Sequence, residues 1–255
     1  MTKIALSIAL ALLVGCADQE QSASSATSDM PVLRIATEGA YAPFNYTNAD
    51  GSLAGFDVDI ANGICAKLQR RCEIVAQDWD GIIPALKSGK YDAIVAAMSV
   101  TPERSAQVDF SEPYFANSLV FLAQESSSFN PDNTAEIEQA NIGAQRSTIS
   151  SQWLQKTYPK VQASYYDTLN NAFLDLAAGR VEVMIADKAP ALAWLQTDAA
   201  KGFTVKGSEI DIDDEVAVAV DKGNSELLNQ INTAIKEMKA DGSYETIVQK
   251  NFGAN

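Results

Sequence analysis

Residues 90–104 combine an apolar run with side chains that can bind a carboxylate. The run is of the β type and too short for a helix, and it ends at the hydroxyl of Ser99, where backbone N–H groups become free. Arg104 follows closely, and a guanidinium offers five donors in a planar fork that can meet both oxygens of a carboxylate. The segment predicts a carboxylate-binding site. The alternative is an arginine on a solvated loop.

A second group combines one acidic and two aromatic side chains. Glu38 comes directly after the strand expected over 32–37, Tyr41 follows it, and Trp79 precedes the helix expected over 80–88. A carboxylate between aromatic rings suits a cation, because the face of a ring attracts positive charge. The alternative is that the two rings belong to the core and that Glu38 is solvated.

Two further candidates follow later strands. Ser147 and Thr148 lie at a turn between a strand and a helix, where free N–H groups can receive an anion. Asp187 ends the apolar run 181–186 and can pair with an ammonium group. The alternative for Ser147 or Thr148 is a helix N-cap.

The elements that position these residues alternate between strands and helices. The first half of the chain predicts strands and helices in the order βαβαβ, over 32–37, 57–69, 73–77, 80–88 and 92–97. The second half repeats this order over 141–145, 149–157, 161–165, 168–178 and 181–186, after a strand-like run over 117–123.

The repeat is also visible residue by residue. Residues 86–96 match residues 176–186, and in both a glycine, Gly89 or Gly179, ends a helix before an apolar strand. We expect an α/β chain with two similar lobes, whose strand ends and helix N-termini face a cleft. An amphipathic helix over 226–240 and the segment 243–250 should return to the first lobe.

The N-terminal residues predict export. Residues 1–15 contain one lysine and then an uncharged apolar run that is shorter than the about 20 residues needed to span a bilayer, which is typical of a cleaved signal. The ending Leu-Val-Gly-Cys resembles a bacterial lipobox, which implies lipidation of Cys16; the alternative is a plain signal peptide. Residues 16–30 should then form a polar, flexible tether.

Composition excludes several classes of function. The 255-residue chain has a formal net charge of −14, which makes nucleic acid and anionic membrane surfaces poor partners. It contains no histidine, which excludes histidine-dependent catalysis and histidine-ligated metals. We expect no metal and no cofactor.

The two remaining cysteines are Cys65 and Cys72, for which a disulfide is the default in an exported protein. On one continuous helix they would lie about 10 Å apart, beyond the roughly 7 Å that a disulfide can bridge between Cα atoms. If they bond, the helix must therefore end between them.

Four stretches taken together, 38–44, 55–60, 79–86 and 91–104, resemble the polar amino-acid solute-binding proteins of ABC importers. The most similar branch is that of the lysine/arginine/ornithine, histidine and opine binders, and the resemblance includes the cysteine pair. It implies a two-lobe periplasmic-binding-protein fold. Each lobe would be a mostly parallel sheet flanked by helices, and two crossing strands would join the lobes. The expected lobes are 31–116 with 214–255, and 117–213.

The resemblance also implies how the main chain of an amino acid would be held. Arg104, with backbone near Ser99 and Thr148, would bind the α-carboxylate. Asp187, the Ser99 hydroxyl and the Ala97 carbonyl would bind the α-ammonium.

The side chain of the ligand would lie between Tyr41 and Trp79, with its distal cation at Glu38. Three positions depart from the pattern: Glu38 replaces a shorter aspartate, Arg146 stands where glycine is frequent, and Ile149 replaces a polar residue. An Arg146 that pointed into the cleft would favour an acidic or opine-like ligand. We expect it to point away.

The function implied is that of a monomeric, lipid-anchored protein of the periplasm or cell surface. It would capture a cationic L-amino acid, first arginine and then lysine or ornithine, and deliver it to the permease of an ABC importer. Two alternatives stay open at this point: an enzyme similar to cyclohexadienyl dehydratases on the same fold, and a sensor that docks on a receptor.

Overall fold

A computed structural model of the protein describes residues 30–253. The export signal predicted over 1–15, the lipidated Cys16 and the tether up to residue 29 lie outside the described residues. The residues from Pro31 onward form one compact unit. No helix within 30–253 is both long and apolar enough to cross a bilayer.

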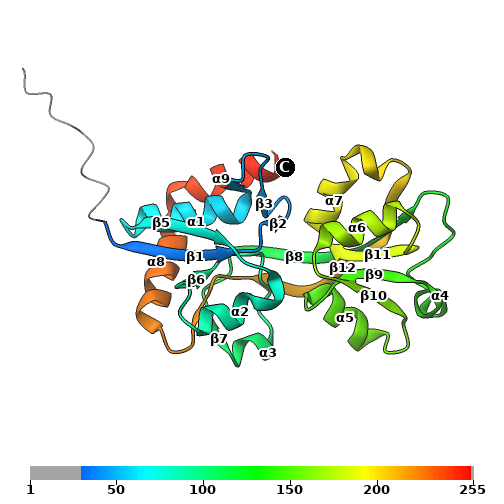
Figure 1. Ribbon diagram of the computed structural model, residues 1–255, viewed down its shortest axis with the longest axis horizontal. Coiled ribbons are helices and arrows are strands. Elements are labelled where there is room, and N and C mark those ends of the chain that lie inside the picture. The colour runs from blue at the N-terminus through cyan, green and yellow to red at the C-terminus, as the bar shows by residue number, and fades with distance from the viewer. Residues whose placement is uncertain (1–29, 254–255) are drawn as a thin grey trace, which may run out of the picture. The chain divides into compact units, whose positions relative to one another are not determined.

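The first lobe is built on a five-stranded sheet in the order β5-β1-β6-β13-β7 (Figure 1). Its strands are β1 (Val32–Thr37), β5 (Arg71–Ala76), β6 (Ala93–Ile94), β7 (Val108–Phe110) and β13 (Ala219–Asp221). β1 pairs in parallel with β5 and β6, whereas β13 is antiparallel to β6 and β7. The mostly parallel half of this sheet carries the strand ends that the sequence predicts at the cleft.

Helices cover both faces of this sheet. α1 (Phe56–Lys67) packs with α8 (Ser225–Asp241) and α9 (Ser243–Phe252), while α2 (Trp79–Lys87) and α3 (Pro102–Ser105) lie on the other side (Figure 1). The C-terminal helices therefore return to the first lobe, as predicted.

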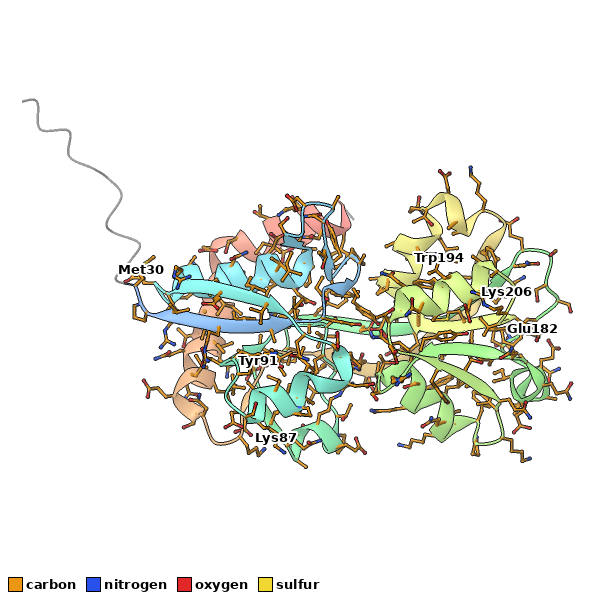
Figure 2. All side chains as sticks on the ribbon, viewed as in Figure 1. Met30, Lys87, Tyr91, Glu182, Trp194 and Lys206 are labelled. Atoms are coloured by element: carbon orange, nitrogen blue, oxygen red, sulfur yellow. A yellow bond between two sulfur atoms is a disulfide. The ribbon has the colours of Figure 1, made fainter. Side chains whose placement is uncertain are left out.

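The second lobe is built on a sheet in the order β10-β9-β11-β8-β12. Its strands are β8 (Phe115–Gln124), β9 (Ile142–Gln145), β10 (Ala163–Tyr166), β11 (Val183–Asp187) and β12 (Phe203–Val216). Its helices are α4 (Thr134–Gln139), α5 (Ile149–Thr157), α6 (Leu169–Ala177), α7 (Lys188–Leu195) and the short 3-10 turn Asp198–Ala200. Side chains fill both lobes in Figure 2, which labels Tyr91 in the first lobe and Trp194 in the second. Trp194 stacks on Phe173 at 4.7 Å between ring centroids.

Two antiparallel strands, β8 and β12, run between the lobes (Figure 1). Their first-lobe ends pair Phe115 with Val216, and Val216 also bridges to Ser99. Phe115 packs there against the ring of Phe44. The predicted two-lobe fold with two crossing strands is confirmed.

The sequence repeat is confirmed as well. Gly89 and Gly179 lie directly beyond α2 and α6, with φ values of 75° and 69°, a region that glycine adopts without strain. The strand predicted over 92–97 is shorter: β6 covers only Ala93–Ile94, and Ala97, with a φ of 47°, then turns the chain away from the sheet. That early turn brings the backbone after β6 to the site described below.

A small sheet of β2 (Ala40–Tyr41), β3 (Asn45–Thr47) and β4 (Leu53–Ala54) was not predicted. Its strands have two or three residues, which is too few to show an alternating pattern. It holds the segment that follows Glu38 against the first lobe.

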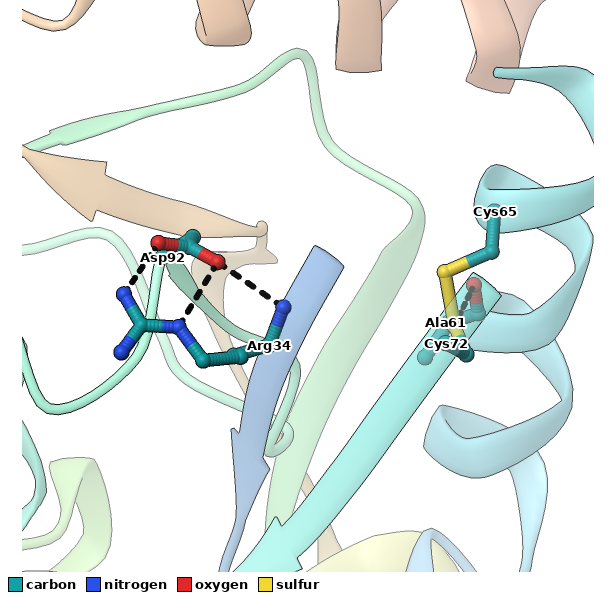
Figure 3. The surroundings of a disulfide bond; sticks show 5 residues. All are labelled: Arg34, Ala61, Cys65, Cys72 and Asp92. Atoms are coloured by element: carbon teal, nitrogen blue, oxygen red, sulfur yellow. Dashed lines mark hydrogen bonds and ion pairs between the residues drawn. A yellow bond between two sulfur atoms is a disulfide. The ribbon is translucent and has the colours of Figure 1, made fainter. Parts of the chain in front are cut away.

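Cys65 and Cys72 form a disulfide with 5.7 Å between their Cα atoms (Figure 3). Helix α1 ends at Lys67, and Gln69 takes a φ of 52° before the chain enters β5. The prediction that the helix ends between the two cysteines is confirmed. Figure 3 also shows Arg34 on β1 paired with Asp92, which comes just before β6, at 2.7 Å.

Candidate ligand-binding site

A small cavity with about 10 Å³ of free space lies between the two lobes. Eight of the nine residues predicted to bind a ligand line it, and the ninth, Ser147, contacts Arg104 through its carbonyl oxygen. The lining residues are Glu38, Tyr41, Trp79, Ala96, Ala97, Ser99, Arg104, Gln145, Thr148, Ile149 and Asp187. The structure thus brings together residues that are up to about 150 positions apart in the sequence, as strand ends facing one cleft predict.

Arg104 is held in this cavity by hydrogen bonds from its backbone and its side chain. It lies in α3, whose N-cap Thr101 accepts a hydrogen bond from the Arg104 backbone N–H, and its side chain is buried. Nη1 donates to the Ser99 carbonyl at 2.8 Å and Nη2 to the Ser147 carbonyl at 2.9 Å, while the guanidinium lies 5.1 Å from the ring centre of Trp79. Burial lowers the pKa of Arg104 to about 10, which leaves it charged at neutral pH. Since a guanidinium has five N–H donors, this one can still bind an anion.

Asp187 supplies the opposite charge at the end of β11. Its side chain is buried, and Oδ2 accepts a hydrogen bond of 2.7 Å from the Tyr41 hydroxyl. Its Oδ1 atom is buried with no hydrogen-bond partner among the described residues. Burial raises the pKa of Asp187 to about 6. A buried acceptor without a donor costs about 1 to 3 kcal/mol, so this oxygen is suited to a cationic donor from a ligand.

Glu38 forms a second acidic position, just past the end of β1. It is 8 % exposed and accepts a hydrogen bond of 2.7 Å from Nε2 of Gln145, which ends β9 in the other lobe. Burial raises the pKa of Glu38 to about 7. The Oε1 atom of Gln145 is buried without a partner in the described part of the chain. Together the carboxylate and this amide oxygen can accept several N–H donors, as a guanidinium or an ammonium group requires.

The Ser99 hydroxyl is engaged by a residue that was not predicted. It donates to Oδ2 of Asp214 at 3.0 Å, and the same oxygen accepts from Nδ2 of Asn117 at 2.8 Å. Asp214 lies on β12 and Asn117 on β8, so this network joins both crossing strands to the site.

Three lining residues, Ala96, Gln145 and Ile149, were not predicted to bind the ligand, although Ile149 is one of the three positions that depart from the family pattern. A signal existed for Asp214: Ile210, Ile212, Asp214 and Val216 alternate with exposed residues, which indicates that Asp214 faces inward.

Arg146 points away from the cavity, as expected. It pairs with Asp80 of the first lobe at 3.6 Å and with Asp167 of its own lobe. Thr148 is the N-cap of α5, with its hydroxyl accepting from the backbone N–H of Ser151. The capping alternative therefore applies to Thr148, which lines the cavity at the same time. Among the described residues no group of acidic or cysteine side chains could hold a metal ion.

The family model of bacterial extracellular solute-binding proteins, family 3, matches residues 33–254. The chain belongs to this family.

Several relatives extend the match. The L-arginine-binding protein of Pseudomonas aeruginosa is 38% identical, over 99% of this chain and 97% of the relative. The lysine/arginine/ornithine-binding periplasmic protein of Escherichia coli is 31% identical, over 97% of this chain and 96% of the relative.

An ancestral arginine-binding protein has been solved both with arginine and with glutamine. The arginine complex has a TM-score of 0.83 and the glutamine complex 0.82, each at 38% identity. These matches cover 87% and 88% of this chain and 98% of the ancestral chain. All of these family members are named binding proteins rather than enzymes, and the role of this chain is amino-acid solute binding and not catalysis.

Proposed function

We propose that this protein binds a free cationic L-amino acid, with L-arginine preferred over lysine and ornithine. One observation carries the proposal: a single buried cavity holds the Arg104 guanidinium, with donors to spare, and the Asp187 carboxylate, with one unpartnered oxygen. These are the two charges that the α-carboxylate and α-ammonium of a free amino acid need. Relatives named for arginine binding support the same ligand class.

The contacts support a division of roles within the cavity. Arg104, with the backbone near Ser99 and Thr148, binds the α-carboxylate. Asp187 binds the α-ammonium together with the Ser99 oxygen and the Ala97 carbonyl. All five residues line the cavity.

The ligand side chain extends between Tyr41 and Trp79 toward Glu38. Glu38 supplies a negative charge and Gln145 an unpartnered carbonyl oxygen. These two acceptors suit a ligand side chain with a guanidinium, which has several N–H donors, better than one with a single amide. The outward direction of Arg146 supports a cationic rather than an acidic ligand, because no other arginine besides Arg104 lines the cavity.

The lobes close around the ligand. Hydrogen bonds from Arg104 to Ser147 and from Gln145 to Glu38 join the two lobes next to the cavity. A ligand that contacts both lobes stabilises this closed arrangement relative to an open one. We propose lobe boundaries at 116/117 and 213/214, where β8 leaves the first lobe and β12 returns to it.

Outside the cell membrane, the protein delivers its ligand to the permease of an ABC importer. We propose that it is monomeric, exported by residues 1–15, and anchored by a lipid on Cys16 through the tether 16–30. The family description as extracellular solute-binding proteins supports an extracytoplasmic location.

A thermal-shift screen against L-arginine, L-lysine, L-ornithine, L-glutamine and octopine tests the ligand class. A ligand at 100 times its Kd stabilises the folded protein by about 2.7 kcal/mol, which raises Tm by several degrees. We expect the largest shift with arginine. Shifts confined to glutamine or octopine would contradict the assignment. Delivery to the importer is tested by the uptake of radiolabelled arginine, which should be lost when the gene is deleted.

A further inference from the structure

Asp214 is a buried carboxylate that the proposed ligand contacts do not use. It is 6 % exposed and is not among the residues that line the cavity. Its Oδ2 atom accepts one hydrogen bond from the Ser99 hydroxyl and one from the Asn117 amide. It therefore lies directly behind Ser99, which is 2 % exposed and does line the cavity.

The bond from Ser99 to Asp214 decides which way the hydroxyl proton points. A serine hydroxyl has one proton to donate and two lone pairs that accept, whereas an ionised carboxylate only accepts. With Asp214 ionised, its Oδ2 atom accepts both from the Ser99 hydroxyl and from the amide nitrogen of Asn117, which can only donate. The proton of Ser99 is thus committed to Asp214, and toward the cavity the Ser99 oxygen can only accept.

We propose that Asp214 is a positioning residue that fixes Ser99 as an acceptor and thereby selects an α-ammonium group at this point of the cavity. The inference rests on the proposed function and adds a residue to it. The Ser99 oxygen and the unpartnered Oδ1 of Asp187 then form two acceptors for one group with several N–H donors. A ligand that lacks the α-ammonium leaves both acceptors without a hydrogen-bond donor.

The test compares L-arginine with 5-guanidinopentanoate, which has the same guanidinium and carboxylate but no α-ammonium. Kd values for both ligands are measured by calorimetry on the purified protein and on three variants: Asp214→Asn, Ser99→Ala and the double variant. The matched control is Glu215→Gln, an exposed neighbour on β12 that loses the same charge.

We expect Asp214→Asn to weaken arginine about tenfold or more and 5-guanidinopentanoate less than about twofold, because an asparagine can donate to Ser99 and release its proton toward the cavity. The double variant should bind arginine no worse than Ser99→Ala alone, since Asp214 acts through Ser99. The Glu215→Gln control should leave both Kd values unchanged.

Equal losses for the two ligands, or additive losses in the double variant, would overturn the inference while leaving the proposed function intact. A wild-type protein that binds no cationic amino acid would overturn both the inference and the proposed function. If Asp214→Asn unfolds, Ser99→Thr and Ser99→Ala decide: threonine keeps a hydroxyl for Asp214 and should keep the preference for arginine over 5-guanidinopentanoate. Alanine should lose it, and an alanine variant that keeps it would contradict the proposal.

Discussion

Nη2 of Arg104, on the first lobe, donates a hydrogen bond of 2.9 Å to the carbonyl oxygen of Ser147, on the second lobe. The guanidinium proposed to bind the ligand carboxylate therefore also forms a hydrogen bond between the lobes. Its position couples ligand binding to closure, because the same side chain takes part in both.

Replacing Arg104 by alanine should weaken arginine binding by about ten- to a hundredfold or more. A hydrogen bond to a charged group contributes about 1.5 to 3 kcal/mol, and the variant also loses a bond between the lobes. Arg104→Lys should recover part of the loss, because a lysine keeps the charge without the fork. Calorimetry measures the Kd, and Arg180→Ala, an exposed arginine that pairs with Asp175 of its own lobe outside the cavity, is the control that should change it little.

Replacing Glu38 by glutamine should lower the preference for arginine over glutamine. The variant keeps the size of the side chain and loses the negative charge that faces the distal cation. We expect arginine to weaken by about tenfold and glutamine to change much less. Competition binding on Glu38→Gln, with the exposed Glu125→Gln as control, measures the ratio; an unchanged ratio would show that Glu38 does not meet the ligand side chain.

Arginine binding should weaken as the pH falls from 8 to 6. In the ligand-free protein burial raises the pKa of Glu38 to about 7 and of Asp187 to about 6, so protons compete with the cationic ligand at both groups. Binding near pH 6.5 should release protons, which calorimetry in buffers of different ionisation enthalpy detects. The release should decrease in Glu38→Gln, and binding without proton release would contradict the assignment.

The raised pKa of Glu38 also predicts how the stability of the folded protein changes with pH. Because the folded protein holds a proton on Glu38 more tightly than the unfolded chain does, the contribution of Glu38 to stability falls as pH rises through 7. Glu38→Gln does not titrate, so without ligand its Tm should rise relative to wild type between about pH 4.5 and 7 and then level off. A difference in Tm that stays constant over this range would mean that Glu38 is solvated.

Removing the disulfide should lower stability and leave the site intact. The bond between Cys65 and Cys72 closes a short loop, for which the loss on removal is about 2 to 3 kcal/mol. Neither cysteine lines the cavity. Denaturant unfolding of a Cys65→Ala and Cys72→Ala double variant should show this loss, and reduced wild type should match it. A changed Kd for arginine would show that the disulfide also affects ligand binding, contrary to the prediction.

The parts of the fold that could be predicted are those with a local signal. Alternating apolar runs revealed most of the strands and helices that carry the site, and Gly89 and Gly179 marked the repeat. Glu38, Arg104 and Asp187 could be proposed as site residues because each closely follows a strand, and strand ends meet at a cleft.

The remainder depends on contacts between distant parts of the chain. Asp214 lies in an acidic stretch whose alternation indicates an inward direction, but its bonds to Ser99 and Asn117, which place it behind the site, are visible only in the structure. Gln145 became a site residue through its bond to Glu38 in the other lobe. No local pattern in the sequence encodes such pairs.

We propose that the cavity between the lobes binds a cationic L-amino acid through Arg104 and Asp187. Calorimetric titration of the purified protein, alongside Arg104→Ala and Asp187→Ala, with L-arginine tests it most directly. We predict saturable binding of one arginine per protein in the wild type and strong weakening in both variants. Wild-type protein that does not bind arginine, or variants that bind it unchanged, would contradict it.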